Sequence, residues 1–364
     1  TVPNPRDSWS RTFCPSITDP ASAVLFAVKA NTEVLSADIA LRATGAFKIG
    51  GIAVNPLPLS TAANATPDIS VPSFLLVPKG PLIDETVSYQ FQNIASDERR
   101  RNGEFEIRAP EGLYDLYPQA TMITVDRQIR NGSGRTSVEV RGIDRTGVQV
   151  NVKSGTDVSG QIMVTGEPTS LNANALRLTL RPLDNIPASL LSRIGPQPVG
   201  SSGAFVLRGV PDGRYTLNVS PLPSNAYVSD IRDGDLSVFD SGIEVVRNPL
   251  NALKVVIGTN AQIIEGVVVG ADGRPAADAT IALIPPAGRR QNPLLYNSAT
   301  SDASGKFRIA APPGDHKLLA WEAVQPTAWM NEQFVAKYED QGISVNVTTV
   351  GIAGIQIPII AKGQ

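Results

Sequence analysis

The sequence predicts an all-β protein: three tandem antiparallel, immunoglobulin-like β-sandwiches with an N-terminal strand extension. Three observations support this fold class. One motif recurs about every hundred residues, short apolar segments alternate with polar residues, and 31 Gly and 29 Pro occur among 364 residues. A fixed repeat indicates an array of one structural unit. Alternation at a period of two, interrupted by turn residues, indicates many short strands and little helix.

The repeat is a Gly-x-Phe turn, a short apolar strand and a Pro-x-Gly turn. Its prolines lie 101 residues apart, and it reads Gly103-Glu104-Phe105 with Pro110-Glu111-Gly112, Gly203-Ala204-Phe205 with Pro211-Asp212-Gly213, and Gly305-Lys306-Phe307 with Pro312-Pro313-Gly314. Pro-x-Gly reverses the chain, so the apolar residues on both sides share one face of a hairpin. The period divides the chain into an extension at 1–45 and sandwiches at 46–155, 156–260 and 261–364.

Each unit is expected to open with a strand that contains glycine and to close with two further strands. The opening strands are 49–54, 158–164 and 264–269; the closing pairs are 138–140 with 148–152, 243–245 with 253–257, and 343–345 with 355–357. About seven short strands in a hundred residues are typical of a β-sandwich. Helix is expected only near 329–338, where Trp329, Phe334 and Tyr338 could cap the core of the third unit.

These motifs resemble those of the carboxypeptidase regulatory-like domains, which are transthyretin-like (prealbumin-like) sandwiches repeated in large secreted bacterial proteins. The third unit carries the resemblance best, through Glu265–Val268, Asp272–Pro275, Ser304–Ile309 and Pro312–Gly314. The resemblance covers about residues 46–361. It implies a fold and a secreted protein, and it implies no shared chemistry.

The N-terminal extension reads like the end of a unit whose beginning is missing. Val24–Val28 and Ala37–Leu41 match a closing strand pair, and Val28 precedes Gly51 by 23 residues, as Val140 precedes Gly160 by 20. An isolated strand pair cannot bury its apolar face. Three interpretations remain open: the missing beginning was removed from this chain, the extension folds back on the first unit, or it completes a sheet of a neighbouring subunit. The candidate interface residues are Trp9, Val24, Phe26, Val28, Ile39 and Leu41.

The sequence offers little catalytic chemistry. It contains one histidine, His316, and one cysteine, Cys14, which is too few for a histidine-based zinc site or an internal disulfide framework. His316 follows a predicted hairpin turn and is expected to be an ordinary strand residue. We therefore expect no catalytic residues, no metal site and no cofactor. Among the Asn-x-Ser/Thr sequons, Asn64 lies in an irregular polar stretch and is the most accessible candidate for glycosylation.

Composition restricts the partners. The net charge is −2, which argues against nucleic acid as a partner, and no apolar run is long enough to span a membrane. The chain begins at Thr1, which fits a mature secreted product and equally a shortened chain. We expect a non-enzymatic, extracellular cell-surface protein, the subunit of a fibre or pilus-like appendage that self-assembles head to tail through its N-terminal strands. The alternative is a carbohydrate- or surface-binding adhesion module of a larger secreted protein, with glycans or other surface proteins as partners.

Overall fold

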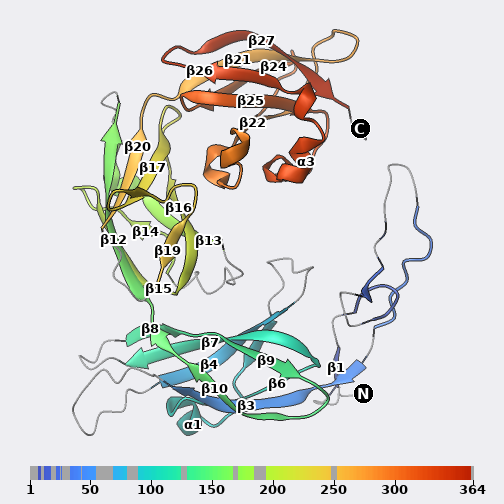
Figure 1. Cartoon of the computed structure of the whole chain (residues 1–364), viewed down its shortest axis with the longest axis vertical. Helices are drawn as coiled ribbons and strands as arrows, with labels where there is room; N and C mark the ends of the chain where they lie inside the picture. Colours follow the sequence, from blue (N-terminus) through green and yellow to red (C-terminus); the bar gives the residue numbers. More distant parts are fainter. Residues whose placement is uncertain are drawn as a thin grey trace.

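The fold is almost entirely β-structure, as the sequence predicts. The computed structural model describes residues 7–9, 12–17, 22–24, 26, 33–41, 43–54, 69–79, 89–123, 129–166, 171–183, 194–246 and 252–361. Within these residues each α-helix spans five residues: α1 (Asp97–Arg101) and α3 (Glu332–Ala336). The sheets form three groups in chain order, with the first and the third at opposite ends of the long axis (Figure 1).

The first group of sheets encloses one hydrophobic core. One sheet has the order β10 (Arg145–Asn151), β3 (Phe47–Val54), β6 (Glu104–Ala109). The other has the order β11 (Lys153–Ser154), β8 (Ile129–Ser133), β7 (Gly112–Ile123), β4 (Ile69–Pro78), β5 (Tyr89–Gln92), with β9 (Thr136–Val140) also paired to β7. Buried and half-buried residues alternate along β6, so every second side chain enters the core, where it meets Phe74 and Leu116 from the facing sheet.

The second group repeats this plan with an additional strand beside its closing strand. One sheet has the order β15 (Ala204–Val210), β12 (Thr156–Thr165), β20 (Leu253–Gly258), β17 (Tyr227–Asp233), β18 (Leu236–Ser237). The other has the order β14 (Gln197–Pro198), β13 (Arg177–Pro182), β16 (Gly213–Ser220), β19 (Ile243–Val245). Polar and apolar residues alternate along β13, because Leu178 and Leu180 are buried while Arg177 and Arg181 are exposed.

The third group buries side chains on both faces of part of its sheet. The strand order is β23 (Asn297–Thr300), β22 (Thr280–Ile284), β25 (Gly314–Trp321), β27 (Ile352–Ile360), β21 (Gln262–Val269), β24 (Lys306–Ala311), with β26 (Ile343–Val347) paired to β25. The short helices η5 (Ala328–Met330), α3 and η6 (Glu339–Gln341) follow β25. They pack on Trp321, whose ring centroid lies 5.9 Å from those of Phe334 and Tyr338. The helical segment predicted near 329–338 is therefore confirmed, as two short turns.

The three groups of sheets follow one another with little intervening chain. No sheet of the described residues mixes strands from two groups, and we propose 46–155, 156–260 and 261–364 as their domain bounds. One residue, Gly155, separates β11 from β12. A Cβ on Gly155 would lie 2.2 Å from the carbonyl oxygen of Gly209, so the backbone passes too close for any other residue. Lys153 forms an ion pair with Asp212 across this junction.

The sheets are mostly antiparallel, with a parallel pair of the same kind in each sandwich. The opening strand and the closing strand lie side by side and run in the same direction, as β3 with β10, β12 with β20, and β21 with β27. Parallel neighbours need a crossover connection, and here the remainder of the sandwich provides it. The sequence does not predict this pairing, because partners such as Gly160 and Leu253 are far apart along the chain.

The strand pair predicted in the N-terminal extension is wrong for the residues that are described. Val24, Phe26 and residues 37–41 are not in strands. Instead β1 (Asp7–Trp9) pairs antiparallel with β2 (Ala43–Gly45). An alternating apolar segment forms a strand only where a neighbouring backbone satisfies its N–H and C=O groups. No described strand pairs with Val24, Phe26 or residues 37–41 to do so.

Candidate functional site

The N-terminal extension exposes apolar side chains that the sequence marks as an interface. The exposed fractions are 48% for Val24, 37% for Phe26, 47% for Ile39 and 64% for Leu41. We call these four residues the extension patch. None of the hydrophobic cores of the described residues contains a member of 1–45. The extension patch is therefore not part of any sandwich in the single chain.

The other residues singled out from the sequence have different positions. Trp9 lies in β1, where its backbone is paired with Ala43. Val28 and the candidate glycosylation residue Asn64 lie outside the described residues. Sequence reasoning missed Leu35, which is 83% exposed. Leu35 continues the alternation of Ala37, Ile39 and Leu41 by one step, so a predicted strand that began two residues earlier would have included it.

Hydrogen bonds to one turn, rather than a hydrophobic core, hold the extension together. Val24 N donates to the carbonyl oxygen of Cys14 at 3.0 Å, and Ala40 N donates to Ser16 Oγ at 2.8 Å. The thiol of Cys14 is buried and donates to the carbonyl oxygen of Asp38 at 3.8 Å. The turn at Cys14 and Ser16 is therefore connected to both chain segments that carry the extension patch.

His316, the one histidine of the chain, closes a hairpin turn. Its Nε2 lies 2.8 Å from the carbonyl oxygen of the residue four positions earlier. The hydroxyl groups of Tyr215 and Tyr114 donate to the equivalent carbonyl oxygens at 2.9 and 3.2 Å. The three residues occupy the same position after the Pro-x-Gly turn of each repeat. His316 is thus a structural counterpart of two tyrosines, a relationship that sequence reasoning missed because the residue types differ.

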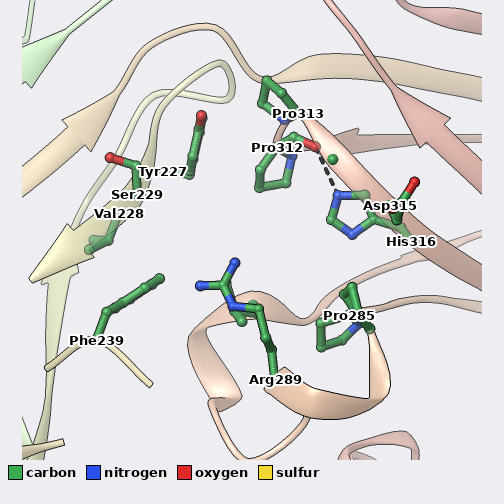
Figure 2. A pocket seen from close by; sticks show the side chains of 13 residues that line it. Tyr227, Val228, Ser229, Phe239, Pro285, Arg289, Pro312, Pro313, Asp315 and His316 are labelled. Carbon is green, nitrogen blue, oxygen red and sulfur yellow. Dashed lines mark hydrogen bonds between the residues drawn. The ribbon is translucent and has the colours of Figure 1, made fainter. Parts of the chain in front are cut away.

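His316 also borders a pocket of about 200 Å³ between the second and third sandwiches. The pocket is lined from the second sandwich by Tyr227, Val228, Ser229 and Phe239, and from the third mainly by Pro285, Arg289, Pro312, Pro313, Asp315 and His316. Figure 2 shows the guanidinium of Arg289 in the middle of this pocket, between Phe239 and His316. The walls are mainly proline and aromatic rings, so the site is apolar apart from a few polar groups.

Arg289 and Asn292 connect the third sandwich to the second. Arg289 contacts Asp240 through two parallel hydrogen bonds of 2.8 and 3.2 Å, and its guanidinium lies 5.8 Å from the ring centroid of Phe239. Asn292, which is 1% exposed, donates to Phe239 O at 2.9 Å and to Asp240 Oδ1 at 3.0 Å. Burial would raise the pKa of Asp240, but the hydrogen bonds from Arg289 and Asn292 outweigh it and lower this pKa. The carboxylate therefore stays ionised.

The pocket residues do not form a nucleophile with its base. Burial lowers the pKa of His316, so the ring is neutral, and the proton on Nε2 is donated to Pro312 O. Nδ1 has no hydrogen-bond partner. Of the hydroxyl groups in the lining, that of Ser229 donates to Val256 O at 3.1 Å and that of Tyr227 to Asn260 Oδ1 at 3.0 Å, and Asp315 accepts from Asn346. Among the described residues no three metal-ligating side chains gather in one place, and no described helix is long and apolar enough to cross a membrane.

Comparison with known proteins gives only distant similarity. No family model and no curated protein matches the chain. Among solved structures, a streptococcal ancillary pilin is 12% identical, with 86% of this chain and 99% of that chain covered and a TM-score of 0.25. BcpA, the major pilin subunit of Bacillus cereus, is 12% identical, with coverage of 86% and 99% and a TM-score of 0.21.

The Bacillus anthracis TIE protein is also similar, at 12% identity and a TM-score of 0.21. The similarity covers 89% of this chain but only 55% of the TIE chain, so this chain spans about half of that protein. At such identities and TM-scores, these similarities establish neither an activity nor a partner for this chain. The resemblance to carboxypeptidase regulatory-like domains stays a prediction, since no family model matches.

Proposed function

We propose that this chain is a non-enzymatic, extracellular structural protein, the subunit of a surface fibre that assembles head to tail through residues 1–45. One observation carries the proposal: the extension patch is apolar, exposed and outside every core of the described chain. Contiguous apolar surface that a single chain leaves open is typical of an interaction site.

The energy available from the extension patch is large enough to matter. Burial of one Val, Leu, Ile or Phe side chain contributes about 1.5–3 kcal/mol. The four described members of the patch and Val28 would together contribute roughly 8–15 kcal/mol before costs. Association costs roughly 4–15 kcal/mol in lost freedom of motion. The patch therefore supports association when main-chain hydrogen bonds or further contacts add to it.

The arrangement of the chain favours an open assembly. β1 of the extension lies beside the first sandwich, and the third sandwich lies at the other end of the long axis from the first (Figure 1). A contact between an extension and a different surface of a second copy is head-to-tail. Such contacts repeat along a filament unless the rotation closes a ring.

Deletion of residues 1–45 tests the proposal. The full chain should form long assemblies in sedimentation and electron micrographs, and the shortened chain should remain monomeric. A point variant refines the test: Leu41→Ser should weaken assembly, whereas Leu236→Ser should not. Leu236 is a matched control because it is 69% exposed, against 64% for Leu41, but lies on β18 of the second sandwich. Assembly that survives the deletion would refute the proposal.

The alternative, an adhesion module for glycans or other surface proteins, is supported by the pocket between the second and third sandwiches. It is less favoured because Phe239, which with Tyr227 supplies the six-membered aromatic rings of the lining, is 3% exposed and lies beneath Arg289. A sugar-stacking platform needs an open ring face. Glycan binding by the chain without residues 1–45 would support the alternative, because the pocket is intact in that variant.

A further inference from the structure

The closing strand of the second sandwich has a neighbour on both sides. β20 pairs in parallel with β12 and antiparallel with β17. On the β17 side, Lys254 is paired with Arg232 and Val256 with Asp230. With both sides occupied, the core-facing residue Leu253 is 0% exposed.

The first sandwich covers the corresponding edge of β10 in another way. Thr136 Oγ1 donates to the carbonyl oxygen of Gln149 at 3.2 Å. A Cβ on Gly134 would lie 2.3 Å from the carbonyl oxygen of Asn151, so the backbone before β9 runs directly along this edge. β8 and β11 extend the contact by pairing with each other. A second strand is not needed there, because the chain itself closes the edge.

In the third sandwich no described strand covers this edge along most of β27. β27 pairs with β21 and meets β25 only through its last two strand residues, Ile359 and Ile360. The segment that follows β25, which corresponds in chain order to β17, instead forms η5, α3 and η6 on the outer face of β22 and β25. Because Glu322 N donates to the carbonyl oxygen of Ile360, the alternate residues Pro358 and Gln356 face the same side, away from β21.

The absence of a strand beside β27 changes the burial of the side chains next to it. Ile355 takes the place of Leu253, since it pairs with Gly266 as Leu253 pairs with Gly160. Leu253 is fully buried, whereas Ile355 is only half-buried at the margin of its core. A strand added beside β27 would therefore complete a core as well as a sheet.

Pro358 restricts how a strand can be added. Pro358 takes the place of Val256 and has no N–H, which sheets tolerate at edge strands. Opposite Val256, β17 has a β-bulge, because Ser229 is inserted between the paired residues Val228 and Asp230. An added strand that bulges at the same place leaves the backbone N–H of Gln356 as the main donor of this edge.

We propose that the open edge of β27 accepts the N-terminal extension of a second copy, with residues 22–28 added antiparallel in the place that β17 takes in the second sandwich. This inference rests on the proposed function and names the acceptor surface for it. Val24, Phe26 and Val28 alternate as a strand requires, and the two described members are exposed in the single chain. Added beside β27, their side chains cover Ile355 while their backbone pairs with Gln356.

Each copy then carries one donor segment, on the extension that leaves the first sandwich, and one acceptor edge, on the third sandwich (Figure 1). Donor and acceptor differ, so two copies cannot satisfy each other through one symmetric contact. Addition continues from copy to copy.

Disulfide trapping tests the acceptor edge in the full chain with Cys14→Ser. One population carries Gln356→Cys, and a second carries Leu25→Cys, Ala27→Cys or Lys29→Cys, which scan the outward positions of the donor. Mixing should give a disulfide-linked dimer for one of these positions. The control acceptor is Arg308→Cys, an exposed position on β24 at the other margin of the sheet. Assembly without trapping at residue 356, or equal trapping at residue 308, would overturn the inference.

A matched pair of variants tests the backbone hydrogen bond. Gln356→Pro removes the N–H that faces the open edge, and Gln356→Ala keeps it while removing the same side chain. The proline variant should need about tenfold more protein to assemble, a loss of about one main-chain hydrogen bond with its neighbours. Tryptophan fluorescence must show that the third sandwich is folded in both Gln356 variants. If the proline variant is unfolded, the disulfide-trapping experiment alone tests the inference. If unmodified chains assemble and neither test responds, the acceptor is elsewhere; if unmodified chains never assemble, the proposed function itself fails.

Discussion

The ring of Phe205 covers Gly160 in the second sandwich. A Cβ on Gly160 would lie 2.4 Å from Phe205 Cζ and 2.5 Å from the carbonyl oxygen of Leu253. The other sandwiches contain the same relationship, as Gly51 with Phe105 and Gly266 with Phe307. The glycine allows the ring to pack directly on the opening strand and allows the closing strand to approach it. This explains why a strand that contains a glycine precedes every Gly-x-Phe turn.

Gly160→Ala should destabilise the second sandwich by about 1–3 kcal/mol, because both close neighbours must move. Hydrogen exchange of second-sandwich peptides under increasing urea would measure this loss without assuming that the whole chain unfolds in one step. Gly288→Ala is the control, since a Cβ there meets nothing within 4 Å. Its effect should stay within about 0.5 kcal/mol. Similar effects of the two substitutions would contradict the packing explanation.

Asp115 should make the first sandwich sensitive to acid. It is 5% exposed, lies 3.1 Å from Lys79 Nζ and 2.5 Å from Arg135 Nη2, and accepts from Ser137 at 2.8 Å. Burial would raise its pKa, but the hydrogen bonds from Arg135, Ser137 and Lys79 outweigh burial and lower it. With the folded pKa below the unfolded value of about 3.9, the ionised carboxylate stabilises the fold above that pH. This stability is lost as the pH falls through the folded pKa.

Asp115→Asn should therefore lower stability at neutral pH by about 1–3 kcal/mol and flatten the decline in acid. Hydrogen exchange of first-sandwich peptides in urea, repeated from neutral pH into acid, measures both the stability at neutral pH and its decline in acid. Asp272→Asn is the comparison, because its carboxylate side chain is 62% exposed and lies 3.7 Å from Arg274. A steep acid decline that persists in Asp115→Asn would show that another group is responsible.

His316→Tyr should preserve the third sandwich, because tyrosine closes the equivalent turn in the other two. His316→Phe should cost about 0.5–1.5 kcal/mol through the lost hydrogen bond, and Tyr215→Phe should cost the second sandwich a similar amount. Burial lowers the pKa of His316, although its hydrogen bond to Pro312 opposes this. The folded state then binds protons less readily than the unfolded state, so the wild-type loses stability as the pH falls below about 6.5.

Trp321 and Trp329 report this effect, since both lie in the third sandwich. The urea concentration at the midpoint of unfolding, followed by their fluorescence, should fall between neutral pH and pH about 5 in the wild-type. The decline should be absent in His316→Tyr. A tyrosine variant that unfolds as easily as His316→Phe would show that the turn needs an imidazole.

Asn292→Ala should loosen the contact between the second and third sandwiches. The substitution removes the Asn292 donor from the buried carbonyl oxygen of Phe239 and leaves Asp240 Oδ1 with Arg289, at a cost of about 1–3 kcal/mol. Small-angle scattering should then report a broader range of overall dimensions. Asn297→Ala removes a hydrogen bond of the same length, to Ala310, that lies within the third sandwich and should leave the dimensions unchanged. Identical scattering from both variants would contradict a clamping role for Asn292.

The repeat motifs predict the sandwiches because their physical cause is local. Glycine before an aromatic ring and Pro-x-Gly at a hairpin determine turns within a few residues. The parallel pair of Gly160 with Leu253 could not be predicted, since it depends on how the sandwich returns to its first sheet. The pocket at Arg289 depends on the contact of two domains, which no single repeat encodes. At the described residues of Val24–Val28 and Ala37–Leu41 the predicted strands are not formed, because alternation describes a face that needs a partner.

The parallel pairing of opening and closing strands has a mechanical consequence. In the second sandwich, tension applied to the two ends of the chain pulls on the start of β12 and the end of β20, which are direct neighbours. The load then acts along these strands and shears all their mutual hydrogen bonds at once, instead of opening them singly. With Gly155 alone between β11 and β12, little slack absorbs the pull before the sheets must yield. A string of such units should resist stretching in single-molecule force measurements until whole sandwiches rupture.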